Sequence, residues 1–151
     1  MKILVSWSTG KDSAWMLHEL NRQHPGGAAG LLTTTNQAFD RVAVHAVRRE
    51  LLEAQAAAAG LPLHVVPLPW PCSNEQYEAI MKDAVAGFVR DGYTHAAFIV
   101  DRLDDILAWA AERGVVNTEG PVNWGRRITC FLRDPDGNVL EFNELIEDSK
   151  A

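Results

Sequence analysis

A short apolar run that leads through a glycine-containing turn into a helix constrains this chain more than any other feature. The run is Ile3-Leu4-Val5, the turn covers residues 8–13, and apolar residues at helical spacing follow to about Gln23. A buried strand that enters a helix in this way leaves backbone N–H groups exposed at the helix N-terminus, and these groups favour a bound anion. We therefore expect the turn to hold phosphate.

The side chains of the turn support phosphate binding. Gly10 allows close approach of a ligand, the hydroxyl groups can donate to phosphate oxygens, and Lys11 supplies positive charge. Asp12 suits a helix cap or a metal ion better than phosphate, and an ordinary capped turn is the alternative interpretation. The Walker pattern is absent from the sequence. The candidate nucleotide- or phosphate-binding residues are Ser8, Thr9, Gly10, Lys11, Asp12 and Ser13.

This turn resembles the Ser-Gly-Gly-Lys-Asp-Ser pyrophosphate loop (PP-loop) of the N-type ATP pyrophosphatases, with Thr9 in place of the first glycine. Residues 1 to about 98 resemble bacterial relatives of diphthine-ammonia ligase in this family. The further matching stretches are Gly30-Leu-Leu-Thr-Thr-Thr-Asn36, Phe39-Asp-Arg-Val-Ala-Val-His-Ala-Val-Arg48 and Val66-Pro-Leu-Pro-Trp-Pro-Cys-Ser-Asn74. The resemblance implies a Rossmann-like fold that binds ATP with Mg²⁺, and amide ligation through an acyl-adenylate. His45 and Arg48 match the family's His-x-x-Arg text and would face the substrate, unless they belong to a solvated helix face.

Composition narrows the choice of partners and compartment. A formal net charge of −6 argues against a general binder of nucleic acid or anionic membranes. Cys72 and Cys130 are the two cysteines, too few for a disulfide framework. No signal-peptide pattern and no apolar run of membrane-spanning length is evident, so we expect a cytoplasmic protein.

The first two thirds of the chain alternate between short apolar strands and helices. After the first helix we expect strands near residues 30–35, 63–66 and 95–100, a long alanine-rich helix over Asp40–Ala59, and a helix that a capping box at Ser73–Gln76 opens. This alternation predicts an α/β fold with a Rossmann-like parallel half-sheet in the strand order 3-2-1-4.

The pattern then changes. A helix over Leu103–Arg113 precedes strand-like stretches at 115–118, 127–132 and 139–142, with a hairpin turn at 134–138 and a frayed tail from Ile146. Residues of about 94–146 resemble one βαβββ module of the vicinal oxygen chelate family, which includes glyoxalases, extradiol dioxygenases and fosfomycin-resistance enzymes. The matching stretches are His95–Asp101, Glu112-Arg-Gly114, Glu119-Gly-Pro-Val122, Trp124-Gly-Arg-Arg127 and Phe131–Glu141.

This second resemblance implies a divalent transition metal. His95 and Glu141 match the two metal-binding positions that one module supplies, and they suit Zn, Mn, Fe or Ni. Two ligands make a weak site, although a homodimer could gather two of each. The alternative is that His95 is a polar residue at a strand start and Glu141 a surface charge at a sheet edge.

Together the resemblances suggest a recombined or engineered chimera, with residues 1–93 as the PP-loop half and residues 94–146 as the βαβββ module. The two would form one mixed sheet with helices packed on it. Because Phe98-Ile99-Val100-Asp101 replaces the Ala-Phe-Gly-Asp of the ligase relatives, we expect a vestigial site for an adenine nucleotide, phosphate or sulfate without efficient catalysis. The alternatives are a metal-dependent enzyme or small-molecule binder of the vicinal oxygen chelate type, or a folded chain without function. A monomer and a homodimer are both compatible with the sequence.

Overall fold

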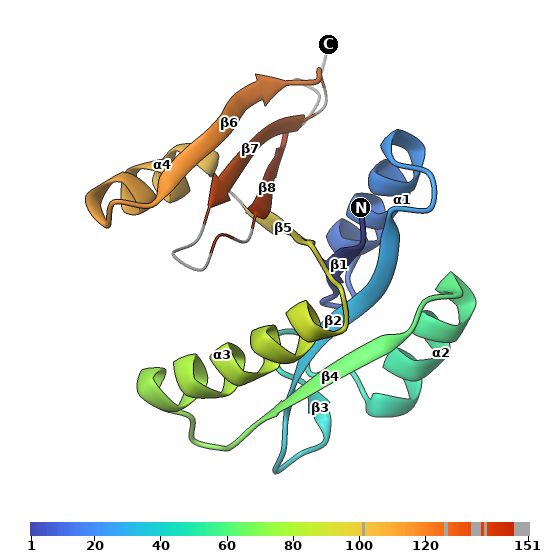
Figure 1. Ribbon diagram of the computed structural model, residues 1–151. Coiled ribbons are helices and arrows are strands. Elements are labelled where there is room, and N and C mark those ends of the chain that lie inside the picture. Colours follow the sequence, from blue (N-terminus) through green and yellow to red (C-terminus); the bar gives the residue numbers. More distant parts are fainter. Residues whose placement is uncertain (101, 126, 134–136, 138, 147–151) are drawn as a thin grey trace. The chain divides into compact units, whose positions relative to one another are not determined.

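The computed structural model describes residues 1–100, 102–125, 127–133, 137 and 139–146 (Figure 1). By its internal contacts the chain divides into two compact units. Unit 1 is Met1–Tyr93 and unit 2 is Thr94–Ala151. Among the described helices, none combines the length and apolar character that a membrane span requires.

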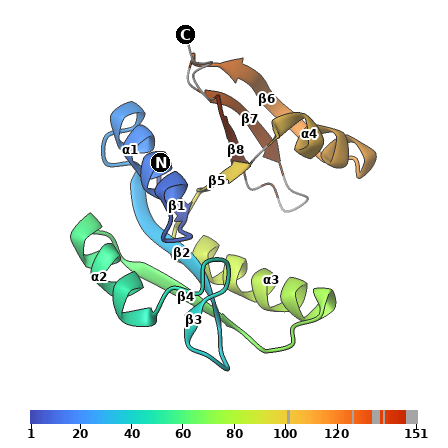
Figure 2. The ribbon, with the colours of Figure 1, turned by 180° about the vertical axis from the view of Figure 1, so that it is seen from behind.

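Unit 1 is built on the long strand β2. Its elements are β1 (Ile3–Ser6), α1 (Lys11–Gln23), β2 (Ala28–Asn36), β3 (Arg41–Val42), α2 (Arg49–Ala59), β4 (Leu63–Leu68) and α3 (Asn74–Arg90). Strand β2 pairs in parallel with β1 and with β4, whereas the short β3 pairs antiparallel with its last residues. Figure 2 shows β3 beside this end of β2.

One face of the unit 1 sheet packs against α3. Leu4, Leu32 and Val66 form the buried cluster with Tyr93, and the partly buried Ile80, Met81, Ala84 and Phe88 of α3 pack on it. The predicted capping box is confirmed: Ser73 Oγ accepts a hydrogen bond from the backbone N–H of Gln76, whose side-chain oxygen accepts one from the backbone N–H of Ser73. Local sequence therefore sets where α3 begins.

Two predictions for this region are wrong. The helix expected over Asp40–Ala59 begins only at Arg49, because Arg41 and Val42 form β3 and the backbone at Asp40 and Ala46 has positive φ angles of 48° and 52°. The guanidinium of Arg41 donates to the carbonyl of Ala46 and closes the intervening turn. The Rossmann-like parallel half-sheet is also wrong as a fold class, since β3 pairs antiparallel with β2 and makes the sheet mixed.

Unit 2 has the βαβββ element order. Its elements are β5 (His95–Val100), α4 (Leu103–Glu112), β6 (Val116–Asn123), β7 (Arg127–Arg133) and β8 (Val139–Leu145). Strand β8 is parallel to β5 and antiparallel to β7, and β6 is antiparallel to β7. The predicted hairpin turn at 134–138, except Gly137, and the predicted frayed tail beyond Ile146 lie outside the described residues.

Helix α4 covers one face of the unit 2 sheet. Leu103 and Ala110 of α4 are buried with Cys130 and Leu132 of β7, and the partly buried Phe142 of β8 joins them. Because side chains alternate along a strand, the residues between these on β7 and β8 point to the other face. That other face carries polar side chains.

Candidate functional site

Four polar side chains on the face of unit 2 opposite α4 form the main candidate site. They are Arg127, Thr129, Glu141 and Asn143, and we refer to them as the polar face. Register places them on one side, because Thr129 pairs directly with Asn143 and Glu141 pairs with Phe131 across the antiparallel β7–β8 ladder. All four are buried, with residue exposures of 1–7%.

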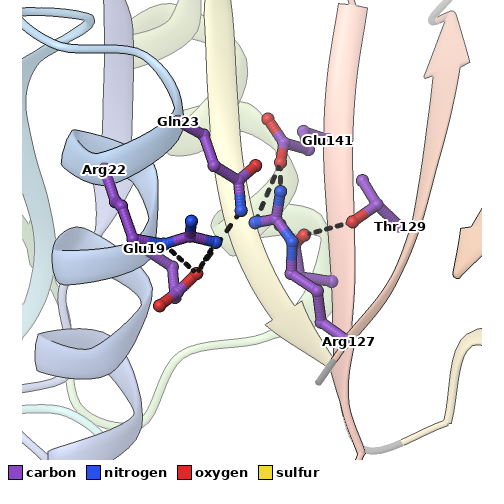
Figure 3. A network of polar contacts seen from close by, with 7 residues as sticks. Glu19, Arg22, Gln23, Arg127, Thr129 and Glu141 are labelled. Carbon is purple, nitrogen blue, oxygen red and sulfur yellow. Dashed lines mark hydrogen bonds and ion pairs between the residues drawn. The ribbon is translucent and has the colours of Figure 1, made fainter. Parts of the chain in front are cut away.

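The polar face is connected as a chain of contacts (Figure 3). Thr129 Oγ1 donates to Asn143 Oδ1 over 2.7 Å, and Asn143 Nδ2 donates to Glu141 Oε1 over 3.1 Å. Arg127 Nη1 lies 3.8 Å from the same carboxylate oxygen. The Thr129 hydroxyl therefore fixes the amide orientation of Asn143, and the amide in turn holds the carboxylate.

Burial makes this arrangement energetically demanding. The side chains of Arg127 and Glu141 are 8% and 4% exposed, and buried charges are tolerated only when they are paired and hydrogen-bonded. The guanidinium keeps its charge at every accessible pH, so Glu141 has a permanent counter-ion. Hydrogen bonds hold the side chains of Thr129, Asn143 and Glu141 in defined orientations, which is a property of binding sites.

The structure brings His95 and Glu141 to the same face. His95 pairs with Val139 and Ala97 pairs with Glu141 in the parallel β5–β8 ladder, so the two predicted metal ligands lie on neighbouring strands, offset by two residues. The imidazole of His95 is half-buried, and its Nδ1 lies 2.8 Å from the hydroxyl of Thr94. Across the described part of the chain, no group of three or more His, Cys, Asp or Glu side chains could hold a metal ion.

In unit 1, the residues of the turn over 8–13 contact one another. Gly10 is the N-cap of α1, and the Ser13 hydroxyl donates to the Gly10 carbonyl over 3.0 Å. Ser8 Oγ donates to Ser13 Oγ over 3.3 Å, and the Thr9 hydroxyl donates to the carbonyl of Ser8. Thr9 has a positive φ of 70°, a conformation that favours glycine, which is the residue of the PP-loop pattern at this position.

The charged residues of the turn pair with each other. Lys11 Nζ lies 2.6 Å from Asp12 Oδ1, and both side chains are largely exposed. Asp12 is the second residue of α1 and not its N-cap, which is Gly10 and makes no side-chain cap. The anion site predicted over residues 8–13 remains a prediction.

Of the two residues predicted to face a substrate, His45 lies beside the turn. A Cβ atom built on Gly10 would come within 3.2 Å of Nε2 of His45, so the imidazole covers this glycine. Arg48 is the N-cap of α2, and its backbone bridges to Arg41. The helical spacing assumed for His45 and Arg48 is wrong, because both precede the first residue of α2.

Figure 3 also draws a polar cluster on helix α1. The Glu19 carboxylate accepts hydrogen bonds from Arg22, at 2.9 and 3.1 Å, and from Gln23 at 3.4 Å. The Arg22 hydrogen bond lowers the pKa of Glu19 below its usual value. These residues lie one turn apart on the helix, and we assign them a structural role in α1.

Sequence reasoning missed three members of the polar face, namely Arg127, Thr129 and Asn143. A signal was present, because polar residues alternate with apolar ones in Arg127-Ile-Thr-Cys-Phe-Leu132 and in Leu140-Glu-Phe-Asn143. The alternation shows that one face of these strands is polar. It does not show that the polar face is buried, and burial is what distinguishes this face from a solvated sheet surface.

Comparison with known proteins supports one of the two resemblances. The family model Glyoxalase/Bleomycin resistance protein/Dioxygenase superfamily matches residues 17–142. A glyoxalase/bleomycin resistance protein from Streptomyces sp. CB03234 is 18% identical, with 95% of this chain and 100% of that chain covered and a TM-score of 0.33. No curated protein matches the chain.

None of these comparisons supports a resemblance to the N-type ATP pyrophosphatases or a chimeric origin. The matched range extends from α1 to β8, whereas the βαβββ resemblance had been limited to residues of about 94–146. The predicted mixed sheet with helices is consistent with this family, whereas the predicted Rossmann-like parallel half-sheet is not supported. The chain belongs to the glyoxalase/bleomycin resistance protein/dioxygenase superfamily.

Proposed function

We propose that this chain is a small-molecule-binding protein of the vicinal oxygen chelate type, whose ligand lies against the polar face of β7 and β8. The observation that carries the proposal is the buried chain of contacts from Thr129 through Asn143 and Glu141 to Arg127. Apolar residues in these positions would stabilise a sheet face at a lower desolvation cost. Retention of fixed polar groups there favours recognition of a polar ligand.

Members of this superfamily typically use divalent metal ions. The donors in the described residues do not fit a resident metal well, because His95 and Glu141 lack a third His, Cys, Asp or Glu ligand and Glu141 is already paired with Arg127. Our proposal is therefore limited to ligand binding by the side chains of the polar face.

A thermal-shift screen tests the proposal. The panel contains compounds with oxygens on neighbouring carbons, such as a 2-oxo acid, a 1,2-diol and a catechol. We expect at least one compound to raise the Tm of the wild-type protein, since a ligand that binds only the folded state stabilises it. Thr129→Val should abolish that shift because it removes the hydroxyl that orients Asn143.

Thr118→Val is the matched control. Thr118 lies on β6, is exposed, and donates to the carbonyl of Phe131, so the same chemical change is made away from the polar face. This variant should keep the ligand-induced shift. If the ligand raises the Tm of Thr118→Val and of Thr129→Val by the same amount while both variants remain folded, the proposed location of the ligand is wrong.

The turn over residues 8–13 is a second candidate site, for phosphate, sulfate or an adenine nucleotide with Mg²⁺. One observation favours it: His45, which the sequence places in a separate segment, lies against Gly10 of the turn. An imidazole and the amides at the start of α1 would both suit an anion. We propose binding without efficient catalysis at this turn.

Calorimetric titration with ATP and Mg²⁺ tests the second candidate. Lys11→Ala should weaken saturable binding, whereas Lys82→Ala, which removes an exposed lysine from α3, should leave it unchanged. Absence of saturable binding by the folded wild-type protein would exclude the turn as a nucleotide site. That result would leave the proposal for the polar face intact.

A further inference from the structure

We infer that Arg127 takes the charge role that a divalent metal would have beside Glu141, so that this domain excludes a metal ion and operates without one. The inference rests on the proposed function, because it concerns the polar face. The question is which positive charge neutralises the buried carboxylate of Glu141. The superfamily typically uses divalent metals, whereas here a guanidinium lies next to the carboxylate that matches a metal-binding position.

The first step concerns the carboxylate. Glu141 Oε1 is engaged twice, by Asn143 Nδ2 at 3.1 Å and by Arg127 Nη1 at 3.8 Å. A metal ion on this oxygen would compete with the amide hydrogen bond and with the guanidinium. The amide is itself held by the Thr129 hydroxyl, so its displacement would break a second buried hydrogen bond.

The second step concerns charge. The Arg127 side chain is 8% exposed and remains protonated, so a divalent ion on Glu141 would lie beside a fixed, poorly screened positive charge. Repulsion between two cations is strongest where water is excluded. The positive charge of Arg127 compensates for the burial of the Glu141 carboxylate. The same charge therefore opposes binding of a metal ion to that carboxylate.

The third step concerns the remaining donors. His95 lies on the same face, one strand away from Glu141 and offset by two residues, and its Nδ1 is within hydrogen-bond distance of Thr94. Within one chain, two donors without a third His, Cys, Asp or Glu among the described residues cannot complete the three-ligand site of a typical catalytic zinc. Ligand number and charge thus both argue against a resident metal.

Metal titration of the untagged, chelator-treated protein tests the inference. Calorimetry and metal analysis with Mn²⁺, Ni²⁺, Co²⁺ and Zn²⁺ should show no stoichiometric binding that depends on Glu141. Cys72→Ser should be used as the background, since the partly exposed thiol of Cys72 could bind soft metals by itself. Stoichiometric binding that Glu141→Gln abolishes would overturn the inference.

The Arg127→Met variant tests whether metal binding appears once the guanidinium is removed, because methionine keeps the approximate length of the side chain and removes its charge. We expect its affinity for Co²⁺ or Ni²⁺ to rise at least tenfold over that of the Arg127 protein, and Glu141→Gln should remove the gain. An unchanged affinity in folded Arg127→Met would show that the guanidinium does not exclude the metal. If this variant does not fold, Arg127→Gln replaces it in the same comparison.

Both arms use metals alone and no organic ligand. A failure of the metal inference would therefore leave the ligand-binding proposal standing, and a negative ligand screen would leave the metal result interpretable.

Discussion

At the scale of single residues, the balance of charge between Arg127 and Glu141 decides what the polar face can bind. Both groups are buried, and each supplies the charge that the other needs. Their nearest charged atoms lie 3.8 Å apart, so the two groups form an ion pair without net charge. The pair explains how the charged side chains of the polar face can be buried.

A double-mutant cycle measures this dependence. Glu141→Gln and Arg127→Met should each lower the free energy of unfolding by about 3–5 kcal/mol, because each leaves one buried charge without its counter-ion. The double variant should lose much less than the sum of the two. Chemical denaturation provides the values.

The exposed pair of Arg113 and Glu112, whose nearest charged atoms lie 3.5 Å apart, is the control for this cycle. Arg113→Met and Glu112→Gln should each change the free energy of unfolding by no more than about 0.5 kcal/mol, since exposed ion pairs contribute little. Additive losses at Arg127 and Glu141 would show that the two charges do not depend on each other.

The buried thiol of Cys130 gives a second test at this scale. Cys130 is fully buried, and desolvation raises its pKa to about 11 from the usual 9.0. In the native protein at pH 8, an alkylating reagent should modify Cys72 and leave Cys130 unmodified, as mass spectrometry of proteolytic fragments can show.

The sign of the pH dependence follows from the raised pKa. Below pH 9 the thiol is protonated in both states, whereas above it the unfolded state releases the proton first, so stability falls as the pH rises from about 9 to about 11. The difference in unfolding free energy between the wild type and Cys130→Ala should shrink over this range. A constant difference would mean that the thiol titrates alike in both states.

At the scale of elements, a side chain from β8 caps helix α4. Glu144 Oε2 accepts a hydrogen bond of 2.5 Å from the backbone N–H of Leu103, the first residue of α4, and the N-cap Arg102 makes no side-chain cap. A carboxylate at a helix N-terminus satisfies an exposed donor and complements the helix dipole. Strand β8 thus contributes both to the polar face and to the start of α4.

Glu144→Ala should lower the free energy of unfolding by about 1 kcal/mol and speed amide exchange in the first turn of α4. Glu112→Ala, at the other end of the same helix, is the matched control and should leave exchange in the first turn unchanged. Equal exchange rates in the two variants would exclude a capping role for Glu144.

Prediction from sequence succeeded where local chemistry decides the structure and failed where pairing between segments decides it. The capping box at Ser73 and Gln76 is formed by neighbours in the chain, so the start of α3 could be predicted. The helix expected from Asp40 failed because Arg41 and Val42 pair with β2, a tertiary contact that overrides the helix propensity of the following alanines.

The candidate site shows the same division. His95 and Glu141 were predicted as metal ligands because they match positions of a βαβββ module. The register of β5 and β8 places them on one face, and their role as ligands stays a prediction. Arg127 was missed because its role depends on a contact with Glu141 across two strands. Sequence alternation shows which face a residue occupies, but not which partner a long side chain reaches.

At the scale of the whole molecule, membership in the superfamily applies to most of the chain, since the match covers residues 17–142. The fold class was mispredicted at this scale because alternating strands and helices do not by themselves determine which strands become neighbours, or in which direction. The PP-loop pattern identified a turn before α1, but it also led to the prediction of a Rossmann-like parallel half-sheet, whereas β3 runs antiparallel to β2.

Chemical-shift mapping by ¹H–¹⁵N NMR tests our central claim most directly, namely that small molecules bind at the polar face. We would titrate the labelled wild-type protein with the compounds that raise its Tm, in the absence of added metal. The account predicts saturable shifts of the backbone amides of Thr129 and Asn143, with those of Gly10 and Lys11 unchanged. Saturable shifts confined to residues 8–13, with β7 and β8 unaffected, would contradict it.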